Sequence, residues 1–439
     1  MILAIIFILL ITLGIGLPLG LLISKKQNLF NVLGGAFPLG IGIFTLLMFL
    51  GNLIGIKFSL LNEVILLASL VIPLMVFARK RIKIFFINLQ KSFKRPVFTS
   101  VEKIMLAVLI FLVATSLVNT LYWPVHIWDS LTLYDIRGKI FAETGFMKEA
   151  WIASYYWGYP LLTSLAHTIV YLCGGAYPQF LYSLFYLSLG LFFYGSLREF
   201  TSRKISMFFT LMLFITQPIF YHSLISLTNL PYTVYLFFAA IYIYLWDKKR
   251  ERGYLILSAL FTGLSTWTRS VEPFWMGLLL IVVLVSLYRK RIWDILVYSI
   301  FFFPIREVWL LFQRTLIVPV VSSTSSVTQV NMVSSLFDPK RWREIITFFN
   351  KNLIIPWGTV FLAFSLSVIF IFLIKKQKKL FLIYLITFIF LGVMVGGIFI
   401  FSLSVKGALN LGDSVQRLSM LFYPLFIFCI GLAVGETEA

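Results

Sequence analysis

Charged residues are scarce in this chain, and acidic residues are the scarcest of them. Only 12% of the 439 residues are charged, whereas 60% are hydrophobic, and the mean hydropathy is +0.97. A soluble globular protein carries about 25% charged residues, so this chain has too few to cover a water-exposed surface of its length. The composition excludes a water-soluble globule and predicts that lipid surrounds most of the surface.

Cysteine and histidine are also rare, which argues against several kinds of site. Cys173 and Cys429 are the two cysteines and both lie in apolar segments, so we expect neither a disulfide framework nor a thiolate metal site. Three histidines argue against a histidine-rich metal centre. The sequence has no Walker loop, dinucleotide-binding glycine fingerprint, metalloprotease motif or GxSxG elbow, which argues against ATP-driven transport by this chain alone.

Long apolar runs are abundant instead. A membrane-spanning helix needs about 20 apolar residues, and the alternation expected of a β-barrel is absent. We therefore predict an all-α polytopic membrane protein with about 13 transmembrane helices. The runs lie near residues 3–24, 30–54, 58–78, 103–122, 178–197, 205–223, 231–246, 254–268, 273–288, 292–316, 353–374, 380–402 and 418–435.

The net charge of +20 comes from short basic clusters between these runs. Nucleic-acid binding is not expected, because clusters of this kind are explained by the positive-inside rule and by anionic lipid head groups. Every odd-numbered turn is basic, so we predict that these turns are cytoplasmic, with the N-terminus outside and the C-terminus cytoplasmic. The clusters begin at Lys25, Arg79, Arg198, Lys248, Arg289 and Lys375.

The even-numbered turns are then outside, and three of them are extended: 123–177, 317–352 and 403–417. The apolar stretch 159–173 within the first would reverse every later turn if it crossed the membrane. It is also only about 15 residues long, shorter than a usual span. We predict that it lies at the outer interface or re-enters it.

The first outer loop carries a carboxylate beside aromatic residues. Asp129 lies between Trp128 and Ser130, just after the fourth run. A carboxylate at a membrane face is suited to act as a general base. The alternative is that Asp129 caps the helix that follows it.

Further polar residues follow in the same loop and are candidate supporting groups: Asp135, Arg137, Lys139 and Tyr159. If 129–142 forms an interfacial helix, Asp135 points away from the face that carries Asp129.

Three other positions place charge at or near the membrane. Arg269 and Glu272 occupy an outer turn, where they form either a stapling ion pair or a phosphate contact in which the glutamate orients the arginine. Arg417 precedes the last run, on the side that the positive-inside rule disfavours; it either snorkels or binds an anionic head group. Arg306, beside Glu307 near the middle of a run, is either a structural partner or a substrate contact.

Taken together, these pieces resemble the GT-C superfamily of membrane glycosyltransferases. That superfamily includes protein O-mannosyltransferases, aminoarabinose transferases of lipid A and the catalytic subunits of oligosaccharyltransferases. The resemblance covers residues ~100–435, and we divide the chain accordingly into accessory spans (1–98) and a GT-C-like module (99–439). It rests on WDS at 128–130, GYPLLTSLAHTIVYL at 158–172, GLSTWTRSVEP at 263–273 and QRLSMLFYP at 416–424.

The resemblance implies a GT-C-like helical bundle with interfacial helices in the first outer loop. It implies inverting transfer of a sugar from a polyprenyl-phosphate-linked donor to a glycan, lipid or protein acceptor. Asp129 would be the base or orient the acceptor, and Arg269 and Arg417 would bind the donor phosphate. Many members carry a second acidic residue where this chain has TNLP, and Asn229 cannot ionise, so a divalent metal has no support here. Similarity to a prokaryotic subset implies the plasma (inner) membrane.

Two other functions stay open. A non-enzymatic transporter or flippase of lipid-linked saccharides fits many spans, but it predicts internal repeats and several deep ionisable residues. A polysaccharide polymerase or ligase fits the basic residues Lys340, Arg341 and Arg343 in the loop 317–352, whereas the acidic early loop argues against it.

Overall fold

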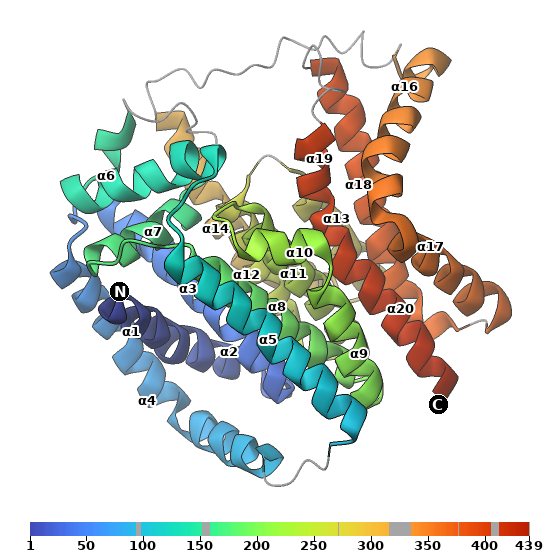
Figure 1. Cartoon of the computed structure of the whole chain (residues 1–439), viewed down its shortest axis with the longest axis horizontal. Coiled ribbons are helices and arrows are strands. Elements are labelled where there is room, and N and C mark those ends of the chain that lie inside the picture. Colours follow the sequence, from blue (N-terminus) through green and yellow to red (C-terminus); the bar gives the residue numbers. More distant parts are fainter. Residues whose placement is uncertain are drawn as a thin grey trace.

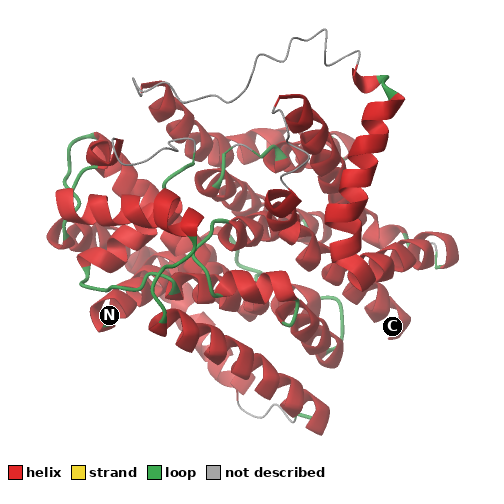
Figure 2. Cartoon of the chain, turned by 45° about the horizontal axis from the view of Figure 1, so that its top comes forward, coloured by secondary structure: helices red, strands yellow, loops and turns green. Residues whose placement is uncertain are grey.

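The computed structural model describes residues 1–93, 98–151, 159–270, 272–315, 335–375, 377–404 and 412–438. Within these ranges every regular element is a helix, as Figure 2 shows in red. The all-α prediction is confirmed. Residues 317–334 and 405–411 of the predicted outer loops 317–352 and 403–417 lie outside the described residues.

The chain forms α-helices, labelled α, and short turns of tighter or wider helix, labelled η. The first third contains α1 (Ile2–Ile11), η1 (Thr12–Gly16), α2 (Leu17–Ile23), α3 (Leu29–Leu53), α4 (Leu60–Phe93), α5 (Ser100–Tyr122), η2 (Ser130–Asp135), α6 (Ile136–Thr144), η3 (Met147–Trp151) and α7 (Leu162–Leu172). The middle contains α8 (Phe180–Arg198), α9 (Arg203–Phe214), α10 (Gln217–Ser223), α11 (Asn229–Lys249), α12 (Arg252–Thr268), α13 (Phe274–Tyr288) and α14 (Ile292–Thr315). The last part contains α16 (Pro339–Phe349), η4 (Asn350–Ile354), α17 (Ile355–Ile369), η5 (Phe370–Ile374), η6 (Lys378–Leu380), α18 (Phe381–Ser404), α19 (Gly412–Leu418), η8 (Ser419–Leu421) and α20 (Phe422–Glu438).

Among the described residues, ten helical segments are long and apolar enough to cross a membrane. The number rises to eleven if α9 and α10, bent by 69°, count as one broken span. The chain is therefore a polytopic α-helical protein, but thirteen spans are not confirmed. Two of the predicted runs fold as the short helices α12 and α13, with 17 and 15 residues. Pro218, near the start of α10, explains the bend, because proline cannot continue the hydrogen bonding of a preceding helix.

The turns with basic clusters gather at one end of the helices. We call this end the basic face; it comprises residues 24–28, 98–103, 199–204, 247–252, 289–294 and 377–380. Side chains join these turns to one another. The Glu251 carboxylate accepts from the backbone N–H of Lys25, and Lys248 donates to the carbonyl of Lys379. Ion pairs join Lys249 with Glu199, Arg252 with Asp294, and Arg203 with Glu102. Another set of described turns is joined by hydrogen bonds at the other end, which we call the opposite face; it comprises 54–59, 123–151, 159–161, 224–228, 269–270, 272–273 and 412–419.

The core lies around α11, which is buried along its whole apolar length and sits in the middle of the bundle (Figure 1). Helix α3 packs closely on α8, where a Cβ on Gly34 would lie 2.5 Å from the backbone nitrogen of Phe192. Only glycine permits this approach. By contrast, α4 and α5 have just 11% and 17% of their apolar windows buried, so they face lipid.

The segment 159–173 forms only the 11-residue α7, too short to cross a membrane. Its residues Leu162–Val170 are all buried, and it packs between α6 and α3. The prediction that it does not span agrees with its length. Its side chains are buried by α6 and α3, and the prediction that it lies at or re-enters the outer interface stays a prediction.

Candidate functional site

Asp129 and Arg417 form an ion pair at the opposite face. Arg417 Nη1 donates to Asp129 Oδ2 at 2.9 Å, although the two residues are 288 positions apart. Asp129 comes from the segment after α5, and Arg417 from α19. The Asp129 side chain makes no capping hydrogen bond to the following turn, so the capping interpretation is wrong.

This pair is accessible from outside. The side chains of Asp129 and Arg417 are 40% and 25% exposed. Asp413 pairs with the same guanidinium at 3.1 Å, but its side chain is 81% exposed. Arg417 is thus held from two sides by carboxylates, and snorkelling alone does not describe it.

Several polar atoms around the pair lack a hydrogen-bond partner among the described residues. Arg417 Nε and Ser130 Oγ are buried and have no hydrogen-bond partner among the described residues. The same holds for Nδ1 of His222, which lies close enough to Arg417 for the guanidinium charge to act on its ring. Buried polar atoms are satisfied in most proteins, so a group of unsatisfied ones indicates a place where a polar ligand can bind.

A second cluster centres on Arg269, just after α12. Its Nε donates to Glu272 Oε1 at 2.7 Å, and its Nη1 donates to Asn229 Oδ1 at 2.9 Å and to Thr228 Oγ1 at 3.3 Å. Both Arg269 and Glu272 are only 12% exposed. The pair staples its turn, as one interpretation predicted, but it is largely shielded from solvent and Arg269 also reaches the start of α11.

Electrostatics keep this arginine charged. Burial lowers the pKa of Arg269, but the charge of Glu272 outweighs burial and raises the pKa above its usual value. The ring of Tyr159 lies 5.5 Å from the guanidinium carbon and covers one side of it. Glu272 Oε2 is buried without a partner among the described residues.

Tyr134 and Thr228 connect the two clusters. The Tyr134 hydroxyl lies 3.1 Å from Thr228 Oγ1, which also accepts from Arg269, and Tyr134 is five residues after Asp129. Burial raises the pKa of Tyr134 to about 12. Beside it, fully buried Arg137 donates to the Tyr159 carbonyl at 3.1 Å, and burial lowers the pKa of Arg137 to about 10.

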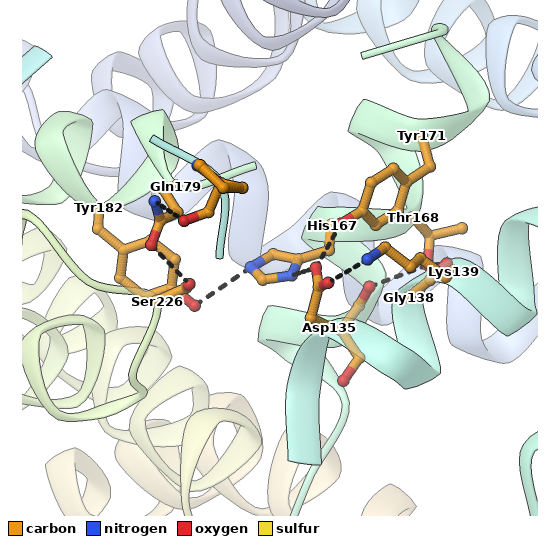
Figure 3. A network of polar contacts seen from close by, with 11 residues as sticks. Asp135, Gly138, Lys139, His167, Thr168, Tyr171, Gln179, Tyr182 and Ser226 are labelled. Carbon is orange, nitrogen blue, oxygen red and sulfur yellow. Dashed lines mark hydrogen bonds and ion pairs between the residues drawn. The ribbon is translucent and has the colours of Figure 1, made fainter. Parts of the chain in front are cut away.

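Asp135 points away from this site, as the helical spacing predicted, into a network between α6 and α7 (Figure 3). Its carboxylate accepts from His167 Nδ1 at 3.1 Å, from Lys139 Nζ at 2.8 Å and from the Tyr171 hydroxyl. His167 Nε2 lies 3.3 Å from the hydroxyl of Tyr182 on α8. Asp135 and Lys139 therefore hold the loop that carries Asp129 and do not line the site.

Sequence reasoning missed His167 and Tyr171. Their signal was present in the sequence: His167 and Tyr171 stand four residues apart in a mostly apolar stretch, which places them on one face of a helix. Arg306 was predicted as either a structural partner or a substrate contact, and its described contacts are structural. It pairs with Glu307 at 2.6 Å, and its guanidinium carbon lies 4.3 Å from the ring centre of Trp275.

The residues present do not fit a divalent metal. No group of three His, Cys, Asp or Glu side chains able to hold an ion occurs in the part of the chain that the structure describes. The amide oxygen of Asn229 faces the guanidinium of Arg269. A second cation there would be repelled.

Comparison with family models, with curated proteins and with solved structures finds no match for this chain.

Proposed function

We propose that this protein is a GT-C-type glycosyltransferase that moves a sugar from a polyprenyl-phosphate donor to an acceptor at the opposite face. The observation that carries the proposal is the ion pair between Asp129 and Arg417. It sets a carboxylate and a phosphate-binding cation 2.9 Å apart at a partly open surface. Arg269, only 12% exposed, adds a second cation.

In the proposed reaction, Asp129 accepts the proton of the acceptor hydroxyl. The hydroxyl oxygen forms a bond to the anomeric carbon while the bond from that carbon to the phosphate oxygen breaks, and the configuration inverts. The electron pair leaves with the polyprenyl phosphate. Arg417 and Arg269 stabilise the negative charge that develops there.

The ion pair also suggests an order of events. While Arg417 is bound to Asp129, the carboxylate is shielded from an acceptor. A donor phosphate competes for the guanidinium, since arginine binds phosphate through two parallel hydrogen bonds. Donor binding would therefore release Asp129 to act as the base.

We further propose that α12 and α13 cross the membrane, which together with the bent α9–α10 pair brings the number of spans to thirteen. The course of α12 supports this, because it starts at Arg252 on the basic face and ends beside Arg269 on the opposite face. The basic face would be cytoplasmic, with the N-terminus outside and the C-terminus inside a prokaryotic plasma membrane.

The test uses the purified protein in liposomes. It measures transfer of radiolabelled sugar from a panel of polyprenyl-phosphate donors to an acceptor. A general base contributes about 100- to 10,000-fold, so we expect Asp129→Asn to lower transfer by at least about 100-fold. Asp413→Asn is the matched control, because it removes a carboxylate from the same arginine at an 81% exposed position. It should keep most activity.

Full transfer by the folded Asp129→Asn variant would remove Asp129 from the mechanism. Absence of transfer with every donor, together with movement of the lipid-linked saccharide across the liposome membrane, would replace the proposal with a flippase.

A further inference from the structure

A cavity of about 520 Å³ lies between the end of α3 and the start of α4, away from the Asp129 site. Its size falls within the range of about 300–1,000 Å³ typical of small-molecule sites. Leu47, Met48 and Gly51 of α3 form one wall, and Glu63, Leu66 and Ser69 of α4 form the other. The turn with Lys57 closes the end at the opposite face.

Glu63 is the unusual member of this lining. Its side chain is 4% exposed, and Oε2 has no hydrogen-bond partner among the described residues. Leaving a buried charged group unsatisfied is costly. Glu63 stands in the first turn of α4, next to the opposite face, and when ionised it lacks a hydrogen-bond donor.

Lys57 supplies the complementary charge at the same cavity. It belongs to the exposed turn before α4, and its stem lies against Gly145. The cavity thus offers a buried carboxylate and a lysine ammonium within one site. A ligand that matches both carries an amine and an anionic group.

The surface beside the cavity is suited to an acyl chain. Ile65 and Ser69 line the cavity, and Ile72 and Val76 continue the same stripe along α4 at helical spacing. Ile65, Ile72 and Val76 are 58%, 63% and 57% exposed. An amphiphile whose head enters the cavity therefore finds an apolar track for its tail, which a free amino acid or a peptide would not use.

We propose that this cavity binds the head group of a zwitterionic membrane lipid with a primary amine, such as phosphatidylethanolamine. The ammonium donates to the Glu63 carboxylate, the phosphate accepts from Lys57, and an acyl chain runs along α4.

The cavity is tied to the loop that holds the candidate active site. Asn52 Nδ2 donates to the carbonyl of Gly145 at 3.0 Å, and its Oδ1 accepts from the backbone nitrogen of Met147 at 3.1 Å. Phe58 donates its backbone N–H to the same carbonyl at 2.8 Å. A lipid in the cavity would therefore stabilise the wall against which the end of α6 rests.

Lipid binding is measured by native mass spectrometry of the full chain after exchange into defined mixtures of phosphatidylethanolamine, phosphatidylcholine and phosphatidylglycerol. Phosphatidylcholine lacks N–H donors, and phosphatidylglycerol lacks the amine. We expect wild type to retain phosphatidylethanolamine at least about tenfold better than either. Glu63→Gln should abolish that preference, while Glu143→Gln, an exposed change on α6 of the same face, should keep it.

A second variant tests the cavity by its volume. Gly51→Leu fills it from α3, where a Cβ meets only Ile56 at ordinary contact distance (3.7 Å), so the helix should tolerate it. We expect this variant to lose the bound lipid while keeping a monodisperse elution profile. Equal retention of the three lipids by wild type would overturn the proposal, as would unchanged phosphatidylethanolamine binding by a folded Glu63→Gln.

Discussion

Replacing Asp135 by Asn tests whether the buried network between α6 and α7 holds the first outer loop. Asp135 is 1% exposed and accepts from His167, Lys139 and Tyr171. Removing one partner of a buried ion pair costs about 3–5 kcal/mol. Because the Lys139 side chain is 51% exposed and can return to water, we expect the lower end, a loss of about 3 kcal/mol in the free energy of unfolding.

The loss of stability caused by Asp135→Asn should become smaller as the pH falls. Burial raises the pKa of Asp135, but the hydrogen bonds from His167, Lys139 and Tyr171 outweigh it and hold the pKa below the usual 3.8. A carboxylate with a lowered pKa in the folded state stabilises the protein above its unfolded pKa, and this stabilisation is lost as the pH falls through the folded pKa. The difference between wild type and Asp135→Asn should shrink as the pH falls below about pH 4.

The measurement is unfolding by SDS titration in mixed micelles, followed by tryptophan fluorescence. Asp413→Asn is the control for loss of an exposed carboxylate and should stay within about 0.5 kcal/mol of wild type. Lys139→Ala should cost no more than about 1 kcal/mol. If Asp135→Asn unfolded at the same SDS fraction as wild type at pH 7, the network would not be what holds this loop.

Three more predictions address the second cluster and the packing. Arg269→Lys loses the forked contacts of the guanidinium, so transfer should fall by about 10- to 100-fold, whereas exposed Arg314→Lys should match wild type in the same radiolabel assay. Gly34→Ala places a Cβ 2.5 Å from a backbone nitrogen and should cost about 1–3 kcal/mol in the SDS titration; Gly20→Ala, with no atom nearer than 4.0 Å, should not. Tyr134→Phe should cost about 1 kcal/mol and leave the pH profile of transfer unchanged below about pH 9, because burial raises the pKa of the hydroxyl to about 12.

The sequence predicted the class of fold and the grouping of the turns. Apolar runs of membrane length leave a helix as the way to pair every backbone group in lipid. Basic residues mark alternate turns because their charge resists transfer across the membrane, and these turns do meet at one face through contacts such as Lys249 with Glu199. Which face is cytoplasmic remains a prediction.

Contacts between distant segments were decided only by the tertiary structure. Asp129 and Arg417 were each identified from the sequence, but their ion pair depends on how α19 packs beside the segment after α5, and no local pattern encodes that. The same reason explains why the α7 side chains are buried, since α6 covers them. The unsatisfied carboxylate of Glu63 became visible only with the cavity between α3 and α4. Sequence fixes which groups a membrane protein must pair or hide, whereas the packing of helices decides which distant groups meet.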